Sequence, residues 1–167
     1  MRAHRAAAAL VAVVCLSSCD ISSYQFVADQ RLSITAPKAQ SHIKAPLTVS
    51  WTMRDFDAVG LDGSATKNAG AYAVFIDRPP MKAGRDLRSL VKDDPACFSD
   101  PRCPDATYLA KEHVFVTTTT SVTVPFIPLK AAAGNDEHTI TVVLLDGRGR
   151  RIGESSWFRT FISRNDV

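Results

Sequence analysis

Apolar and polar residues alternate along several short stretches of this chain, and this alternation predicts its fold. In residues 47–53 every second residue, from Leu47 to Met53, is apolar, and the residues between them are Thr or Ser. A period of two places alternate side chains on opposite faces, so the stretch is predicted to form a half-buried β-strand. Similar patterns predict six further strands, at residues 32–36, 72–76, 113–116, 121–126, 139–145 and 156–162.

Seven short strands separated by turn residues predict an all-β class, with an antiparallel two-sheet sandwich as the architecture. Each strand has one apolar face to bury, and two facing sheets bury these faces against each other. Asp146 and Gly147 follow the sixth strand and predict a tight hairpin leading into the last one. We expect four large apolar side chains to anchor the core, namely Trp51, Tyr72, Phe126 and Ile140.

The first 19 residues contain the parts of a secretory signal. Arg2 and Arg5 precede a short apolar run over residues 6–16, and the sequence Leu-Ser-Ser-Cys then ends at Cys19. This segment resembles a bacterial lipoprotein signal with its lipobox. The resemblance implies cleavage before Cys19 and lipid on both the thiol and the amine of that cysteine. A plain secretion signal and a membrane-spanning helix are the alternatives, but the apolar run is shorter than the roughly 20 residues that a spanning helix needs.

This resemblance divides the chain into three parts. Residues 1–18 are then the signal peptide, residues 19–30 the lipidated N-terminus and a polar tether, and residues 31–164 the folded domain. At ~3.3 Å per extended residue, the tether reaches about 35 Å from the membrane. We therefore expect the protein on the extracytoplasmic face of a cell membrane, with the lipid on Cys19 as its anchor.

Two of the four cysteines stay within the predicted domain. Cys15 leaves with the signal peptide and Cys19 carries lipid, so Cys97 and Cys103 remain as a pair. In an oxidising compartment such a pair is expected to form a disulfide. A zinc site is the alternative, but no second pair of thiols and no nearby histidine completes a set of four ligands.

The charge of the chain gives little support to a nucleic-acid partner. The formal net charge of +3 falls to +1 when Arg2 and Arg5 are removed with the signal. Arg148, Arg150 and Arg151, which we call the arginine turn, form the only basic cluster in the sequence. A solvated hairpin tip explains them, and contact with an anionic membrane or a glycan is the alternative.

Three stretches of the chain resemble the fibronectin type III family. Residues 46–51, which include Trp51, are similar to its second strand, and residues 72–76 to its third. Residues 138–155 resemble its sixth strand, the following turn and its final strand. The resemblance spans residues 31–162 and implies a fibronectin III-like or immunoglobulin-like sandwich.

The chain departs from this family in two places. His138 occupies the position where the family usually has the tyrosine of its tyrosine corner, and residues 78–112 replace a short connection. The insertion is predicted to contain a short helix that begins at Gly84 or Asp86 and ends before Pro95. It is either a functional element or a cover for a sheet edge, and the sequence leaves both open.

The last predicted strand has aromatic residues on both faces. In one arrangement Phe158 and Ile162 point inward, and Trp157, Arg159 and Phe161 form an exposed contact surface. In the opposite arrangement Trp157 is a core residue, which is the more usual position for tryptophan.

No residue pattern points to catalysis. His42, His113 and His138 occur in no metal-binding or nucleophile motif. Asp55 and Asp57 begin a calcium-like loop, but the fifth and twelfth positions lack the oxygen ligands that an EF-hand requires. We therefore expect no enzyme activity, no cofactor and no metal.

These observations predict a non-catalytic binding or interaction module at the cell envelope, with an envelope protein as its partner. A cell-wall glycan is the alternative ligand, bound through Trp157, Tyr108 and the arginine turn. A small extracytoplasmic hydrolase or metal-dependent enzyme is the third hypothesis. The expected docking surfaces are the insertion and an exposed sheet edge.

Overall fold

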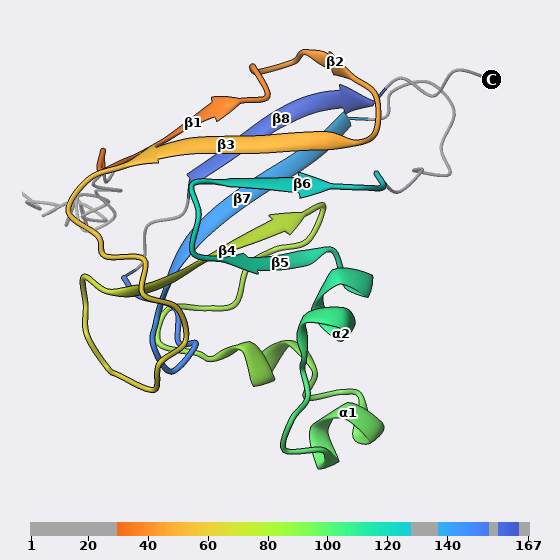
Figure 1. Cartoon of the computed structure of the whole chain (residues 1–167). Helices are drawn as coiled ribbons and strands as arrows, with labels where there is room; N and C mark the ends of the chain where they lie inside the picture. The colour runs from red at the N-terminus through yellow and green to blue at the C-terminus, as the bar shows by residue number, and fades with distance from the viewer. Residues whose placement is uncertain (1–29, 128–136, 154–156, 164–167) are drawn as a thin grey trace, which may run out of the picture.

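The structure is a computed structural model that describes residues 30–127, 137–153 and 157–163, and these residues form eight strands in two sheets (Figure 1). The first sheet has the order β1-β3-β6 and contains β1 (Leu32–Ala36), β3 (Leu47–Met53) and β6 (Ser121–Val124). The second has the order β2-β8-β7-β4-β5 and contains β2 (His42–Ile43), β8 (Trp157–Ser163), β7 (Glu137–Asp146), β4 (Gly70–Ile76) and β5 (Val114–Thr117). Between β4 and β5 lie the 3₁₀ helix η2 (Leu87–Leu90) and the helices α1 (Pro95–Ser99) and α2 (Ala106–Lys111).

The all-β class is confirmed, and the predicted number of strands is corrected from seven to eight within the described residues. The additional strand is β2, which pairs in parallel with β8 through His42 and Ile162. The other strand pairs, from β1–β3 to β7–β8, are antiparallel. A two-residue strand is too short to show an alternating pattern, so β2 had no signal in the sequence.

The inner faces of the two sheets share one hydrophobic cluster. Trp51 of β3 packs edge-on against Tyr72 of β4, with 5.2 Å between the ring centroids. Ile140 of β7 is completely buried in the same cluster. Three of the four expected anchors are therefore core residues, because alternation along β3, β4 and β7 directs them to the space between the sheets.

The prediction that Phe126 is the fourth core anchor is wrong, because this residue is 62% exposed. β6 ends at Val124, and Pro125 follows with no amide hydrogen for the ladder. The period of two ends there, and Ile127 takes the inward position that Phe126 would have had.

All seven residues of β4 are buried, although only one of its faces was predicted to be so. Residues 78–112, which we call the insertion lobe, cover the outer face of the five-stranded sheet. Met81, Leu87 and Leu109 of the lobe form a second hydrophobic cluster with outward-facing residues of that sheet, among them Phe75. The lobe therefore covers a sheet face as well as joining two strands, and Figure 1 shows it projecting below both sheets.

Candidate functional site: the insertion lobe and its groove

The first helix of the insertion lobe lies within the segment predicted to be helical, but it is shorter than predicted and covers only Leu87–Leu90. The helix is the 3₁₀ helix η2, and Asp86 is its N-cap, with Oδ1 accepting a hydrogen bond from the Ser89 amide at 3.2 Å. Leu87 is buried against the sheet. At the base of the lobe, Arg78 forms an ion pair with Glu112, which joins the beginning of the insertion to its end.

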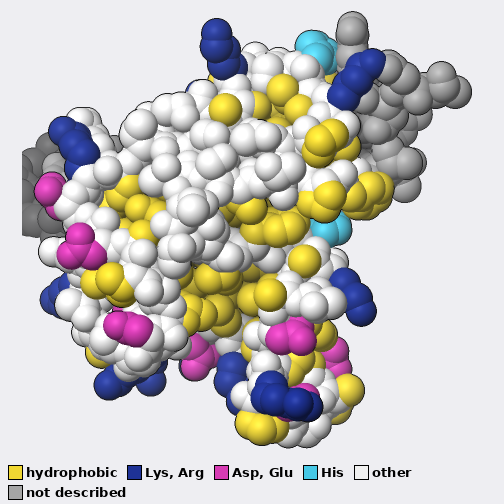
Figure 2. Space-filling model, viewed as in Figure 1, with side chains coloured by type: hydrophobic (Ala, Val, Ile, Leu, Met, Phe, Trp, Pro, Cys, Tyr) yellow, Lys and Arg dark blue, Asp and Glu magenta, His cyan; other side chains and the backbone are white. Residues whose placement is uncertain are grey.

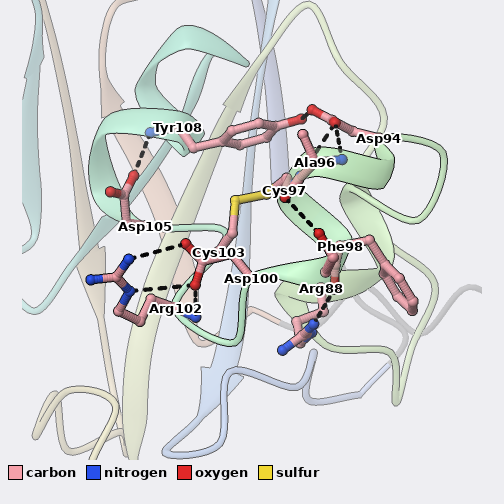
Figure 3. The surroundings of a disulfide bond; sticks show 11 residues. Arg88, Asp94, Ala96, Cys97, Phe98, Asp100, Arg102, Cys103, Asp105 and Tyr108 are labelled. Carbon is pink, nitrogen blue, oxygen red and sulfur yellow. Dashed lines mark hydrogen bonds and ion pairs between the residues drawn. A yellow bond between two sulfur atoms is a disulfide. The ribbon is translucent and has the colours of Figure 1, made fainter.

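Asp94 connects the other two helices of the lobe. Its carboxylate accepts hydrogen bonds from the amides of Ala96 at 3.1 Å and Cys97 at 3.3 Å, so it caps α1. The Tyr108 hydroxyl of α2 donates a third hydrogen bond to it at 2.9 Å (Figure 3). The bond from Tyr108 is the largest cause lowering the pKa of Asp94, and the same bond raises the pKa of Tyr108.

The predicted disulfide between Cys97 and Cys103 is confirmed, with 5.2 Å between the two Cα atoms. It closes the turn between α1 and α2, and Cys97 is buried (Figure 3). Within this turn, Asp100 accepts a hydrogen bond from the Arg102 amide at 2.9 Å, which lowers the pKa of Asp100.

Neither α-helix of the lobe was predicted from the sequence, although each has a recognisable start. Asp94 is followed by Pro95 at the first helical position, which is a typical N-terminal signal. Asp105 caps α2, with Oδ1 accepting a hydrogen bond from the Tyr108 amide at 2.7 Å. The two helices have only five and six residues, too few for a clear helical period.

The lobe contains an open groove of about 730 Å³, which we call the basic groove. Five cationic residues line it, namely Arg78, Lys82, Arg85, Arg88 and Lys92. Two acidic residues, Asp86 and Asp93, also line it. The apolar part of the lining comes from Pro79, Pro80, Met81, Leu90 and Phe98. The groove therefore combines an excess of positive charge with apolar walls.

Phe98 is the large hydrophobic side chain that the lobe exposes most, at 52%. The guanidinium of Arg88 lies 5.5 Å from the centroid of its ring, and Arg88 Nη2 donates a hydrogen bond to the Phe98 carbonyl at 2.7 Å (Figure 3). These contacts position an aromatic ring and a cation side by side, a combination that is common at protein interfaces.

The arginine turn lies against the beginning of the insertion lobe. The Arg151 amide donates to the Arg85 carbonyl at 2.8 Å, and Arg151 Nη1 donates to the Met81 carbonyl at 2.7 Å. Arg148 and Arg150 are exposed. Figure 2 shows Lys and Arg side chains along the lower border of the molecule, where the lobe and the β7 hairpin end lie. The structure thus places the arginine turn beside the cationic residues of the insertion lobe, which are scattered in the sequence.

The face of β8 that was proposed as a contact surface points into the molecule. Phe161 is completely buried, Trp157 is partly buried against the core, and Arg159 Nη2 donates to the Ile34 carbonyl at 2.6 Å. The exposed residue is instead Phe158, at 70%. The prediction of an exposed contact surface that includes Phe161 is therefore wrong. The reason is the pairing of β8 with β7, which places Phe161 opposite the buried His138.

Tyr108 has a different environment from the residues of β8. Its hydroxyl is bound to Asp94, and its side chain lines a smaller hollow of about 510 Å³ with Asp100, Arg102 and Lys111. Trp157 packs against the core between the sheets. The residues considered for glycan stacking therefore lie in two different parts of the fold.

His138 forms a buried chain of hydrogen bonds with Asp77 and Ser163. Nδ1 donates to the Asp77 carboxylate at 2.5 Å, and Nε2 lies 3.0 Å from the Ser163 hydroxyl oxygen. This is the connectivity of a Ser-His-Asp triad. However, His138 is completely buried and Ser163 is 7% exposed. The three residues tie the ends of β4 and β8 to the beginning of β7, the corner position where the family resemblance expects a tyrosine.

Neither a metal centre nor a spanning helix is found in the part of the chain that the structure describes. No group of three or more His, Cys, Asp or Glu residues there is arranged to hold a metal ion. No helix among these residues is long and apolar enough to cross a membrane. No known protein family, curated protein or solved structure gives a significant match to the chain.

Proposed function

We propose that this protein is a membrane-anchored extracytoplasmic lipoprotein whose folded domain is a non-catalytic interaction module for another envelope protein. We further propose that the domain is a fibronectin III-like or immunoglobulin-like sandwich. The sheet orders and the packing of Trp51 against Tyr72 support this assignment. The chain departs from the family at His138 and in the insertion lobe. His138 is buried in the fold, and the lobe contains three short helices.

The anchor is proposed from the sequence alone. Cys19 and the rest of the signal and tether lie outside the described residues. The disulfide between Cys97 and Cys103 supports a location outside the cytoplasm, because disulfides persist in oxidising compartments.

One observation carries the proposed binding role. The inner side of the insertion lobe is fixed to the sheet by buried apolar residues, whereas its outer side has an open groove and the exposed ring of Phe98. A folded, disulfide-closed insertion of this kind is a rigid platform for a partner. The glycan alternative has less support, because Trp157 packs against the core and the Tyr108 hydroxyl is bound to Asp94.

A catalytic role for the Asp77–His138–Ser163 chain is not part of this proposal. A serine nucleophile has to reach its substrate, and Ser163 is almost fully buried beside the completely buried His138. We assign these residues to the stability of the fold.

Capture of partners from native membranes tests the proposed function. A deletion of residues 85–105 would remove much of the insertion lobe, but it is unsuitable as a test variant. Leu87 belongs to the second hydrophobic cluster, and its loss would disturb the sheet. Phe98→Ala changes only an exposed side chain, and Phe158→Ala is a matched control on β8. We expect the wild type and Phe158→Ala to capture the same envelope protein and Phe98→Ala to lose it. Equal capture by both variants would refute docking on the lobe.

A further inference from the structure

We propose that the basic groove binds an acidic, extended segment of a partner protein. This inference rests on the proposed function and adds the chemical class of the docking segment. It follows from the distribution of charge in the groove, its apolar walls and its position relative to the predicted anchor.

Part of the charge in the groove is already neutralised. Arg78 is paired with Glu112 at the base of the lobe, and Lys92 is paired with Asp93. Asp86 is engaged as the N-cap of η2. These groups therefore have partners within the fold.

Lys82, Arg85 and Arg88 supply the remaining positive charge. Lys82 and Arg85 are exposed, and neither is in an ion pair among the described residues. Arg88 Nη2 donates to the Phe98 carbonyl, and its positive charge also interacts with Asp100, so its guanidinium is only partly available to a further carboxylate. The exposed Arg150 lies beside this positive region, because its backbone forms an isolated antiparallel β-bridge with the backbone of Asp86. Carboxylates are the natural complement to such a surface.

The walls of the groove favour a peptide that also has an apolar or aromatic side chain. Pro79, Pro80 and Met81 form one apolar stretch of the lining, and Phe98 adds an exposed ring beside Arg88. Interfaces with a central aromatic anchor and surrounding polar contacts match this composition. The expected occupant is therefore an extended segment in which Asp or Glu residues flank an apolar one.

The position of the lobe favours a protein over the headgroups of the anchoring membrane. The predicted tether enters the domain at β1, and Figure 1 shows the beginning of β1 and α1 at opposite sides of the molecule. The groove is lined by the segment that leads into α1, which places it away from the point of attachment.

A peptide-binding measurement with the full lipidated protein in neutral phosphatidylcholine nanodiscs tests this inference. The probe is a fluorescein-labelled peptide with six glutamates around one phenylalanine, followed by fluorescence anisotropy, and its lysine analogue is the reference. Lys82→Gln/Arg85→Gln removes two exposed cations from the groove. Lys38→Gln/Lys67→Gln removes two exposed cations from other loops and is the matched control.

We expect the glutamate peptide to bind and the lysine analogue not to bind. Lys82→Gln/Arg85→Gln should weaken binding about tenfold, because two charge–charge contacts are lost, and the control should stay within about twofold. Binding should also weaken from 0.1 to 1 M salt, as the Debye length falls from about 10 to 3 Å. Equal affinities of both variants, or no binding of the glutamate peptide, would overturn the inference.

Two outcomes separate this inference from the proposed function. If Phe98→Ala abolishes partner capture while the glutamate peptide fails to bind, the function stands and the acidic occupant is wrong. If the peptide binds but no protein is captured from membranes, the protein-partner function is wrong and the preference for carboxylates stands. Loss of peptide binding in phosphatidylglycerol nanodiscs, together with lipid cross-links from the groove, would assign the groove to headgroups and overturn the inference.

Discussion

At the scale of single residues, His138 has the clearest structural role. It is completely buried, stacks on Phe161 with 5.2 Å between the ring centroids, and connects Asp77 to Ser163. The sequence indicated a departure from the tyrosine corner at this position. The two partners of His138 could not be predicted from the sequence, because they lie 61 and 25 residues away along the chain.

His138→Ala is expected to lower the free energy of unfolding by about 3 kcal/mol, because it leaves a cavity and removes one hydrogen-bond partner of the largely buried Asp77 carboxylate. Ser163→Ala removes a single hydrogen bond and should cost about 1 kcal/mol. Denaturant titration of both variants measures these losses. A loss below about 1 kcal/mol for His138→Ala would contradict its role in holding the corner.

Asp94 makes the lobe sensitive to acid. Its folded-state pKa is lowered, first by the hydrogen bond from Tyr108, below the value of about 3.9 that it has in the unfolded chain. The stabilisation is therefore complete above pH 3.9 and is lost as the pH falls through the folded-state pKa.

A carboxyl-carbon NMR titration should give a midpoint for Asp94 below 3.9, and Tyr108→Phe should raise this midpoint. An ordinary midpoint in the wild type, unchanged by Tyr108→Phe, would show that Asp94 does not link α1 to α2.

At the scale of secondary-structure elements, the disulfide is expected to stabilise the lobe more than the sheets. Closing a loop between cysteines six positions apart contributes on the order of 2 kcal/mol. Cys97→Ala/Cys103→Ala should therefore increase hydrogen exchange in α1 and α2, while the amides of β7 stay protected. Hydrogen exchange by mass spectrometry measures both regions. Equal loss of protection in β7 would show that the lobe and the sheet unfold together.

Most of the strands could be predicted because alternation is a local property of the sequence. β3 has the predicted bounds, 47–53, and its neighbour β1 also begins and ends as expected. The burial of both faces of β4 could not be predicted, because it depends on a lobe that folds back over the sheet. The same limitation applies to the basic groove, whose residues the sequence shows only as scattered charges.

The alternation of residues in β8 does not predict which face of this strand is buried. Both faces of the strand contain large apolar residues, so the sequence left two arrangements open. Pairing with β7 selects the one in which Phe161 is buried and Phe158 is exposed. Part of the candidate contact surface was therefore wrong. The disulfide could be predicted because Cys97 and Cys103 are the two cysteines that remain when Cys15 and Cys19 are assigned to the predicted signal and lipid anchor.

At the scale of the whole molecule, we propose a lipid-anchored domain whose insertion lobe lies away from the point at which the predicted tether joins it. Cys19→Ser should abolish incorporation of labelled palmitate and release the protein from the membrane fraction, because two or three acyl chains supply the stable attachment. Cys15→Ser should leave both unchanged. Membrane retention of Cys19→Ser without label would refute the lipid anchor.

We propose the insertion lobe as the site at which another envelope protein docks. Photo-cross-linking in the native membrane tests it most directly, with p-benzoylphenylalanine placed at the exposed position of Phe98 and, as a control, at that of Phe158. We expect one reproducible protein adduct from position 98 that is absent from position 158. No protein adduct from position 98, or the same adducts from both positions, would contradict it.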